Sequence, residues 1–274
     1  MPSEVSPTMA RMEGRLAGVR AKLDRADRHA DELKEEIAAF FDREPFAIER
    51  HEEISGKIVF RVRVREQPPL QISTIIGDAI HALRTSLDLL AGELVRANGG
   101  TPARATCFPI ADTEGAFRQQ LPKALAGASK KAIVAIRSLK PYRSGAAKLW
   151  LLHHLDIVDK HRLLLTVGCA YTAVSLDFAE DLRRSGFKTA KDIPEMRLSL
   201  KPADRLFPLR DGAEVFGIEA AARSSGSSDM SPHFKFQIAF AGGEVAEGQI
   251  VGDTLSALRG TVHDTVKRLE PLLT

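Results

Sequence analysis

Cysteine is scarce in this chain: there are two among 274 residues, and no apolar run approaches the length of a membrane span. Cys107 and Cys169 form no close-spaced motif, so we interpret both as reduced, with Cys169 in the core because it lies in an apolar, strand-like run. The first twenty residues contain no apolar signal region. We therefore expect a cytoplasmic protein that does not associate with membranes.

The sequence also lacks the motifs of common enzyme classes. It has no His-Glu-x-x-His helix, no glycine-rich phosphate loop, no Gly-x-Ser-x-Gly turn and no dinucleotide fingerprint. Its net charge of +3 is too small to indicate nucleic acid by itself. Cofactors are therefore unknown from the sequence, and function has to be inferred from residue patterns.

The chain does contain enough apolar sequence for a substantial core, with 44% hydrophobic residues. From residue 12 to residue 40, apolar residues recur at alternating steps of four and three, which predicts a long amphipathic helix within residues 1–44 that ends before Pro45. Its apolar seam packs along another helix of the same chain or along a second subunit. About 30 helical residues span about 45 Å, longer than a small domain, so we expect part of the seam to project and a homodimer to cover it.

Alternating runs predict β-strands in two regions. Residues 45–66 contain two short runs separated by Ser55-Gly56, which predicts a hairpin. On its second strand three arginines would contact phosphates or form the solvated face of a sheet: Arg61, Arg63 and Arg65. A sheet-rich part follows at 163–249, with a flexible loop at 224–229.

Helical patterns fill the remaining regions. Two strongly apolar segments, 70–95 and 147–160, predict a central helix pair within a helical core at 67–162, which also includes helices at 114–121 and 123–139. A final amphipathic helix is predicted at 250–274. We therefore predict an α+β fold in a single domain, residues 1–274. In it, the long N-terminal helix and the central apolar helices pack on a mainly antiparallel sheet, built chiefly from the C-terminal third.

The central helix at 70–95 carries a single polar stripe on an otherwise apolar surface. His81, Arg84 and Asp88 lie within about 60° of one another on a helix. A helix that is apolar almost all round is expected inside a protein, where buried charge needs a partner or a ligand. The stripe therefore indicates a site.

The second apolar segment contains three of the eight histidines within nine residues. One helical face is apolar apart from its histidines and contains Trp150, His154, Ile157 and His161. Another face contains His153, Asp156 and Lys160. Because the unperturbed pKa of histidine lies near neutrality, His154 and His161 are acid–base candidates on the apolar face.

We expect the two central helices to pack together and to form a site for an anionic ligand, of hydrolase or nuclease type. Arg84 is permanently charged and suits bidentate contact with a carboxylate or phosphate. The predicted catalytic residues are His81, His161, Asp88 and Asp159. The predicted ligand-binding residues are Arg84, His154, Lys160 and Arg162. The expected partners are a small anionic ligand or nucleic acid and a second copy of the chain.

Two alternatives remain. Zinc or iron could bind to a carboxylate and three histidines, namely His81, His154 and His161, but the sequence has no metal motif and Arg84 would disfavour a cation, so we predict no metal. In the other alternative Arg84 pairs with Asp159 or Asp88 and the stripe only locks two helices together. The protein is then a non-enzymatic interaction or scaffold protein that dimerises through its N-terminal helix.

Two motifs carry a family resemblance: Gly77-Asp78-x-x-His81-x-Leu83-Arg84-x-x-Leu87-Asp88 and Leu152-His153-x-Leu155-x-x-x-Asp159-Lys160-His161-Arg162. With them the chain resembles, over most of its length, an uncharacterised group of bacterial proteins, which implies no known activity. A looser resemblance is to the HEPN helical ribonucleases, whose site uses an Arg with a His about five to seven positions downstream. No Arg–His pair here has that spacing.

Overall fold

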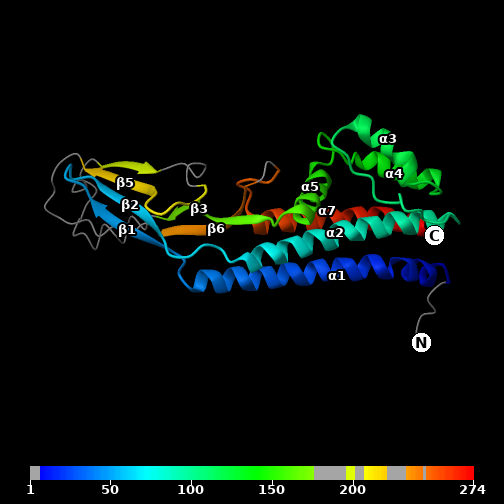
Figure 1. Ribbon diagram of the computed structural model, residues 1–274, viewed down its shortest axis with the longest axis horizontal. Helices are drawn as coiled ribbons and strands as arrows, with labels where there is room; N and C mark the ends of the chain where they lie inside the picture. Colours follow the sequence, from blue (N-terminus) through cyan, green and yellow to red (C-terminus); the bar gives the residue numbers. More distant parts are fainter. Residues whose placement is uncertain (1–6, 176–195, 201–206, 221–232, 243–244) are drawn as a thin grey trace, which may run out of the picture.

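The structure is a computed structural model that describes residues 7–175, 196–200, 207–220, 233–242 and 245–274. The molecule is elongated, with its helices at one end and its strands at the other (Figure 1). The predicted loop at 224–229 and the side chain of Cys169 lie outside the described part.

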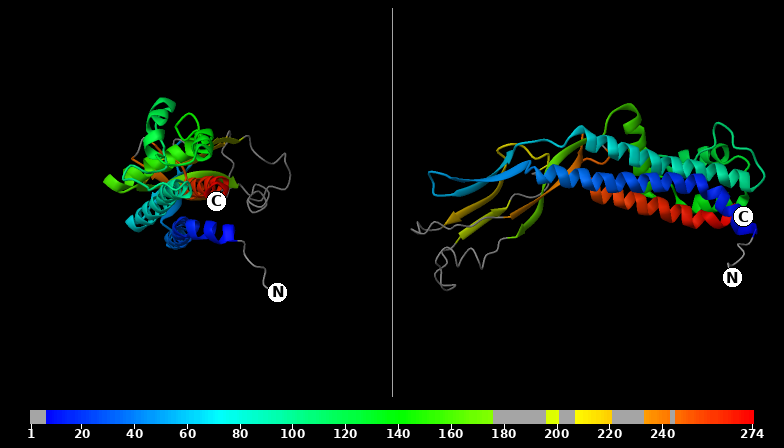
Figure 2. Two further views of the ribbon diagram at one scale, coloured as in Figure 1. Left: turned by 90° about the vertical axis from the view of Figure 1, so that its right-hand side faces the viewer. Right: turned by 90° about the horizontal axis from the view of Figure 1, so that it is seen from below.

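Three long helices lie side by side: α1 (Pro7–Asp42), α2 (Leu70–Ala97) and α7 (Val251–Leu269) (Figure 2). The predicted long N-terminal helix is therefore confirmed. Its seam is at most 5% exposed at Leu16, Val19, Leu23, Ala26, Ala30, Leu33 and Phe40. The same chain therefore covers these seven positions and leaves Met12 and Ile37 partly buried, so little apolar surface projects from the seam, and dimerisation stays a prediction.

The strands are β1 (Phe46–Glu52), β2 (Ile58–Val64), β3 (Leu165–Ser175), β4 (Met196–Leu200), β5 (Glu214–Ala220) and β6 (His233–Ala241). One sheet has the order β1-β2-β5-β4, and β3 pairs with β6 in a second sheet. All these strand pairs are antiparallel, which confirms the predicted α+β class. The predicted hairpin, with Gly56 in its turn at φ 83°, supplies two of the four strands in the larger sheet, so the C-terminal third contributes less of it than expected.

Arg61 and Arg63 of β2, and Arg65 directly after it, lie on the solvated face of the sheet. Phe60 and Val62 are buried, whereas the neighbouring guanidinium groups point outward to carboxylates. The shortest nitrogen–oxygen distances are 2.8 Å from Arg63 to Asp211, 3.3 Å from Arg65 to Glu44 and 4.0 Å from Arg61 to Glu53. Each of these exposed cations faces a carboxylate of the same chain, which favours the solvated face of the sheet over phosphate contacts.

Aromatic packing joins the helices to the strands. The ring centroid of Phe46 lies 5.9 Å from that of Phe40 at the end of α1 and 5.1 Å from that of Phe236 on β6. Gly168 makes room for this ring, because a Cβ at that position would lie against it. The absence of a side chain at Gly168 therefore allows β3 to pack closely against the Phe46 ring of the hairpin.

Three shorter helices form a lobe beside the long ones: α3 (Glu114–Ala124), α4 (Lys130–Leu139) and α5 (Ala147–His161) (Figure 1). The prediction of one helix over 123–139 is wrong at its start. Gly127 adopts φ 88°, and the Ser129 hydroxyl accepts the N–H of Ala132, so that α4 begins only at Lys130. The predicted C-terminal helix is α7 followed by the 3₁₀ turn η3 (Glu270–Leu273).

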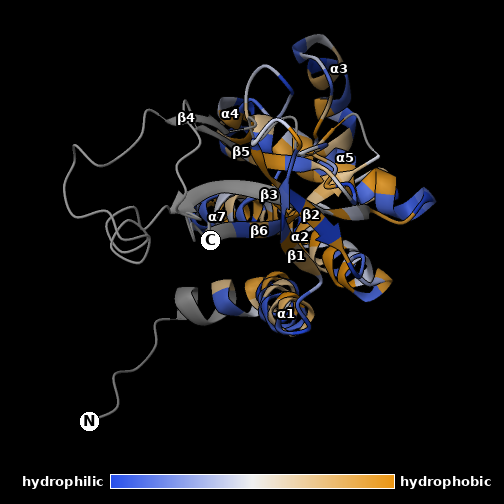
Figure 3. Cartoon of the chain, turned by 90° about the vertical axis from the view of Figure 1, so that its left-hand side faces the viewer, coloured by the Kyte–Doolittle hydropathy of each residue, from blue (hydrophilic) through white to orange (hydrophobic). Residues whose placement is uncertain are grey.

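Figure 3 looks along the helices and shows α5 on the side of α2 that faces away from α1. In the described ranges, no helix combines the length and the apolar character needed to cross a bilayer.

Candidate functional site

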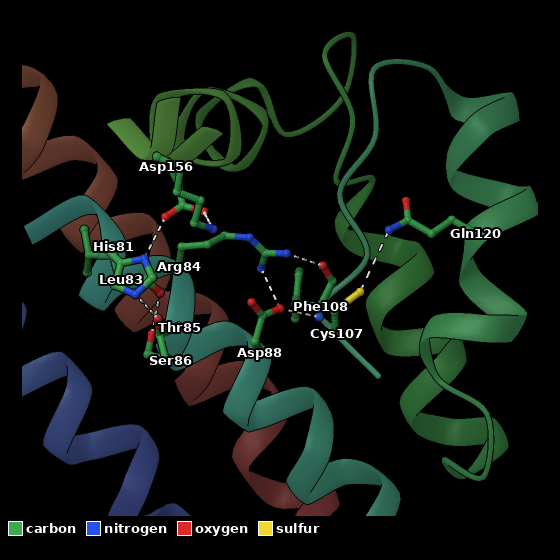
Figure 4. A network of polar contacts seen from close by, with 11 residues as sticks. His81, Leu83, Arg84, Thr85, Ser86, Asp88, Cys107, Phe108, Gln120 and Asp156 are labelled. Carbon is green, nitrogen blue, oxygen red and sulfur yellow. Dashed lines mark hydrogen bonds and ion pairs between the residues drawn. The ribbon is translucent and has the colours of Figure 1, made fainter. Parts of the chain in front are cut away.

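The two central helices α2 and α5 pack together, as predicted, and the polar stripe of α2 lies against α5 at His81 and against the loop at Phe108 (Figure 4). Leu83 of α2 and Leu152 and Leu155 of α5 are all at most 2% exposed and belong to one core. The face of α5 that meets α2 is the one with His153, Asp156 and Lys160. Two separate polar networks result, one around Arg84 and one around His81.

The first network fixes a loop onto α2. Arg84 donates from Nη2 to the carbonyl oxygen of Phe108 at 3.0 Å, and its Nη1 lies 3.0 Å from Asp88 Oδ1. Asp88 in turn accepts the N–H of Phe108 at 2.8 Å. The side chain of Arg84 is only 7% exposed and Phe108 is fully buried. Of the pairings considered for Arg84, the ion pair with Asp88 is therefore present. Nη2 bonds to the loop, whereas the buried Nη1 makes no hydrogen bond to the described residues.

Burial changes the acidity of groups beside this network. Desolvation raises the pKa of Asp88, although Arg84 and the Phe108 N–H oppose the rise. Desolvation and the charge of Asp88 also raise the pKa of the Cys107 thiol. The raised pKa makes this free thiol less reactive than an ordinary cysteine, although the charge of Arg84 opposes the rise.

The second network joins a half-exposed histidine to a buried carboxylate. His81 Nδ1 lies 3.0 Å from Asp156 Oδ1, and Lys160 donates from Nζ to the other oxygen of the same carboxylate. The side chain of Asp156 is 3% exposed, whereas those of His81 and Lys160 are 52% and 51% exposed. An ionised carboxylate only accepts hydrogen bonds, so His81 carries a proton on Nδ1 and, in its neutral form, has Nε2 free to accept another. The Thr85 hydroxyl lies 3.4 Å from that Nε2.

Asp159 lies against the backbone of α2. A Cβ on Gly77 would collide with the carboxylate of Asp159, so only glycine leaves room for it there. Desolvation raises the pKa of Asp159, and the nearby charges of Asp156 and Asp78 add to the rise. The charges of Asp156 and His81 therefore act on this carboxylate, and Asp159 does not pair with Arg84.

His153 lies between the two networks. Burial, with the charges of Arg84 and His154, lowers the pKa of His153 from its ordinary value of 6.5 to about 4. Its Nδ1 is buried and has no hydrogen-bond partner among the described residues. His153 is therefore neutral at physiological pH.

The other predicted site residues lie elsewhere. His154 stacks on Trp150 with ring centroids 4.2 Å apart, and its Nε2 lies 3.0 Å from Asp112. His161 and Arg162 are exposed at the end of α5, where Arg162 lines a cavity of about 70 Å³ near Phe240. The structure thus gathers His81, Asp159 and Lys160, and it does not bring His154, His161 or Arg162 to them. The described residues contain no group of three or more potential ligands placed to hold a metal ion.

Two residues of this cluster, Asp156 and His153, were missed as site residues. The signal was present, because a helix places both on one face with Lys160. That face carries more charge than the face of His154 and His161. The sequence pattern therefore favours a site on the more apolar face of α5, which does not meet α2.

The fold and the cluster define an α+β protein with a histidine–carboxylate pair between two helices. No family model, curated protein or solved structure matches this chain.

Proposed function

We propose that this protein is a hydrolase of an anionic ester, with His81 as the acid–base group and Lys160 as the contact to the anion. The observation that carries the proposal is the bond from half-exposed His81 to buried Asp156. Such a carboxylate orients the imidazole and stabilises its protonated form, which is the arrangement that general-base catalysis requires. Perturbed pKa values at Asp88, Asp159 and His153 around the pair are typical of functional sites.

The roles of two residues differ from the sequence-based hypothesis. Arg84 and Asp88 are engaged by the backbone of Phe108, which supports the structural alternative for that half of the stripe. Lys160 takes the role of anion contact because its ammonium group is half-exposed and belongs to the same cluster as His81. A water molecule or substrate hydroxyl would replace Thr85 at His81 Nε2 and give up its proton there.

The test compares His81→Ala with His51→Ala, a matched removal of an exposed histidine on β1. Both are assayed with p-nitrophenyl phosphate, bis(p-nitrophenyl) phosphate and p-nitrophenyl acetate, and their folding is checked by circular dichroism. We expect His81→Ala to lower kcat by about 100-fold or more and His51→Ala to leave it unchanged. Lys160→Gln should mainly raise KM for the anionic esters. Full activity in His81→Ala, or no turnover by the wild type together with no phosphate-induced shift of the His81 ring signals in NMR, would refute the proposal.

A further inference from the structure

The lobe of α3, α4 and the start of α5 concentrates positive charge that the net charge conceals. Between Glu114 and Asp156 the chain contains eight Lys and Arg residues and not one Asp or Glu. Since the whole chain carries only +3, the rest of it is net acidic. All eight cationic side chains are exposed. Within the described residues only one of them makes an ion pair, that of Arg118 with Glu114.

The cations on α4 share one face. At about 100° per residue, Lys130, Lys131, Val134 and Arg137 fall within an arc of about 120°. Val134 is 61% exposed, whereas Ala132 and Ile136 on the opposite side are fully buried. Arg268 of α7 extends this face, because it donates to the Ser138 hydroxyl at 2.9 Å.

We infer that this face of α4 binds the phosphate backbone of a nucleic acid. Unpaired, exposed lysines and arginines are the groups that release counterions from a polyanion, and they need no sequence-specific contact to do so. A protein partner is a poorer fit, because lysine is depleted in protein–protein interfaces. A membrane surface is also a poorer fit, because interfacial helices insert a broad apolar face, and the apolar face of α4 is used in its own core.

The test measures the fluorescence anisotropy of labelled 25-mers of duplex DNA, single-stranded DNA and RNA between 50 and 300 mM KCl. The variant Lys130→Gln/Lys131→Gln/Arg137→Gln is compared with Lys22→Gln/Arg25→Gln/Arg28→Gln, which removes the same charge from α1. We expect the α4 variant to weaken binding at least about tenfold at 100 mM KCl and to reduce the salt slope by about 2 to 3, while the α1 variant binds as the wild type does. The three probes then show which nucleic acid is preferred.

Several outcomes would overturn this inference. They are no binding by the wild type to any of the three probes, an equal loss in the α1 variant, and binding to phosphatidylserine vesicles or to polyglutamate that exceeds binding to all three nucleic acids. His81→Ala should bind as the wild type does, since His81 is not part of the α4 face. A failure of the hydrolase proposal would therefore leave this measurement unaffected.

Discussion

The two polar networks on α2 start from the same stripe and differ in what covers them. Arg84 is 7% exposed because the loop at Phe108 closes over it, whereas His81, one turn earlier, is 52% exposed. In the first network the backbone N–H and C=O of Phe108 both bind to the stripe. In the second, the buried partner is a side chain and the histidine remains accessible. Helical spacing alone therefore does not distinguish a structural ion pair from a candidate site. The difference comes from whether another segment of the chain buries the side chain.

The largest effect is expected from removal of the covered group. Arg84→Ala would leave the Phe108 carbonyl unpaired and the Asp88 carboxylate without its cation, and should cost about 3 kcal/mol or more of unfolding free energy. His81→Ala removes the hydrogen bond to Asp156 and the longer one to Thr85 at a half-exposed position, leaves Asp156 paired with Lys160, and should cost about 1 kcal/mol. Urea denaturation followed by circular dichroism measures both.

The matched control is Arg118→Ala. Arg118 and Glu114 form another pair four residues apart on a helix, but one whose side chains are exposed. This variant should unfold at the same urea concentration as the wild type, because exposed ion pairs contribute little to the free energy of unfolding. An Arg84→Ala protein as stable as Arg118→Ala would show that the loop at Phe108 does not depend on the first network.

The second-largest effect is expected in the pH dependence of stability, and it comes from His153. Its pKa is about 4 in the folded protein and near 6.5 in the unfolded chain, so the unfolded state takes up a proton first as the pH falls. The stability that the neutral ring contributes is complete above pH 6.5 and is lost as the pH falls to about 4. With a discount for partial exposure, the loss is about 2 kcal/mol.

His153→Leu tests this expectation. The variant cannot take up the proton and also removes the unpartnered Nδ1, so its unfolding free energy should change less between pH 7 and pH 4.5 than that of the wild type. His154→Leu is the control at the neighbouring position, where the ring pairs with Asp112. Equal pH dependence in wild type and His153→Leu would contradict the lowered pKa.

Periodicity was sufficient to predict the hairpin, the α+β class, the contact of α2 with α5 and the helices, apart from the start of α4. It did not predict which face of α5 turns inward. The apolar pattern predicts that the face with His154 meets α2, but this histidine stacks on Trp150 and pairs with Asp112 instead. The charged face turns inward because Lys160 pairs with the buried Asp156 carboxylate and His81 donates a hydrogen bond to it, and such a pairing between helices has no signature in a single sequence.

Two further features were hidden for other physical reasons. The late start of α4 depends on the positive φ of Gly127, which the helical pattern of the surrounding residues masks. The net charge of the chain does not indicate the basic face of α4, because acidic residues elsewhere offset its positive charge.

The smallest effect concerns Asp159, which lies against Gly77 next to the accessible network. Its pKa is raised in the folded protein, so the folded state holds its proton at pH values where the unfolded chain, with a pKa near 3.8, has lost it. The contribution of this carboxyl group to stability therefore falls as the pH rises through the raised pKa.

Asp159→Asn removes that penalty and keeps the shape of the side chain. We expect the variant to be slightly more stable than the wild type at pH 7 and equal to it near pH 3.5, where the carboxyl group is protonated in both states. Asp24→Asn, an exposed position on α1, is the control for the change in net charge. A variant less stable than the wild type at pH 7 would mean that the ionised Asp159 stabilises the accessible network, so that this half of the stripe, like the half at Arg84, would contribute to holding the helices together.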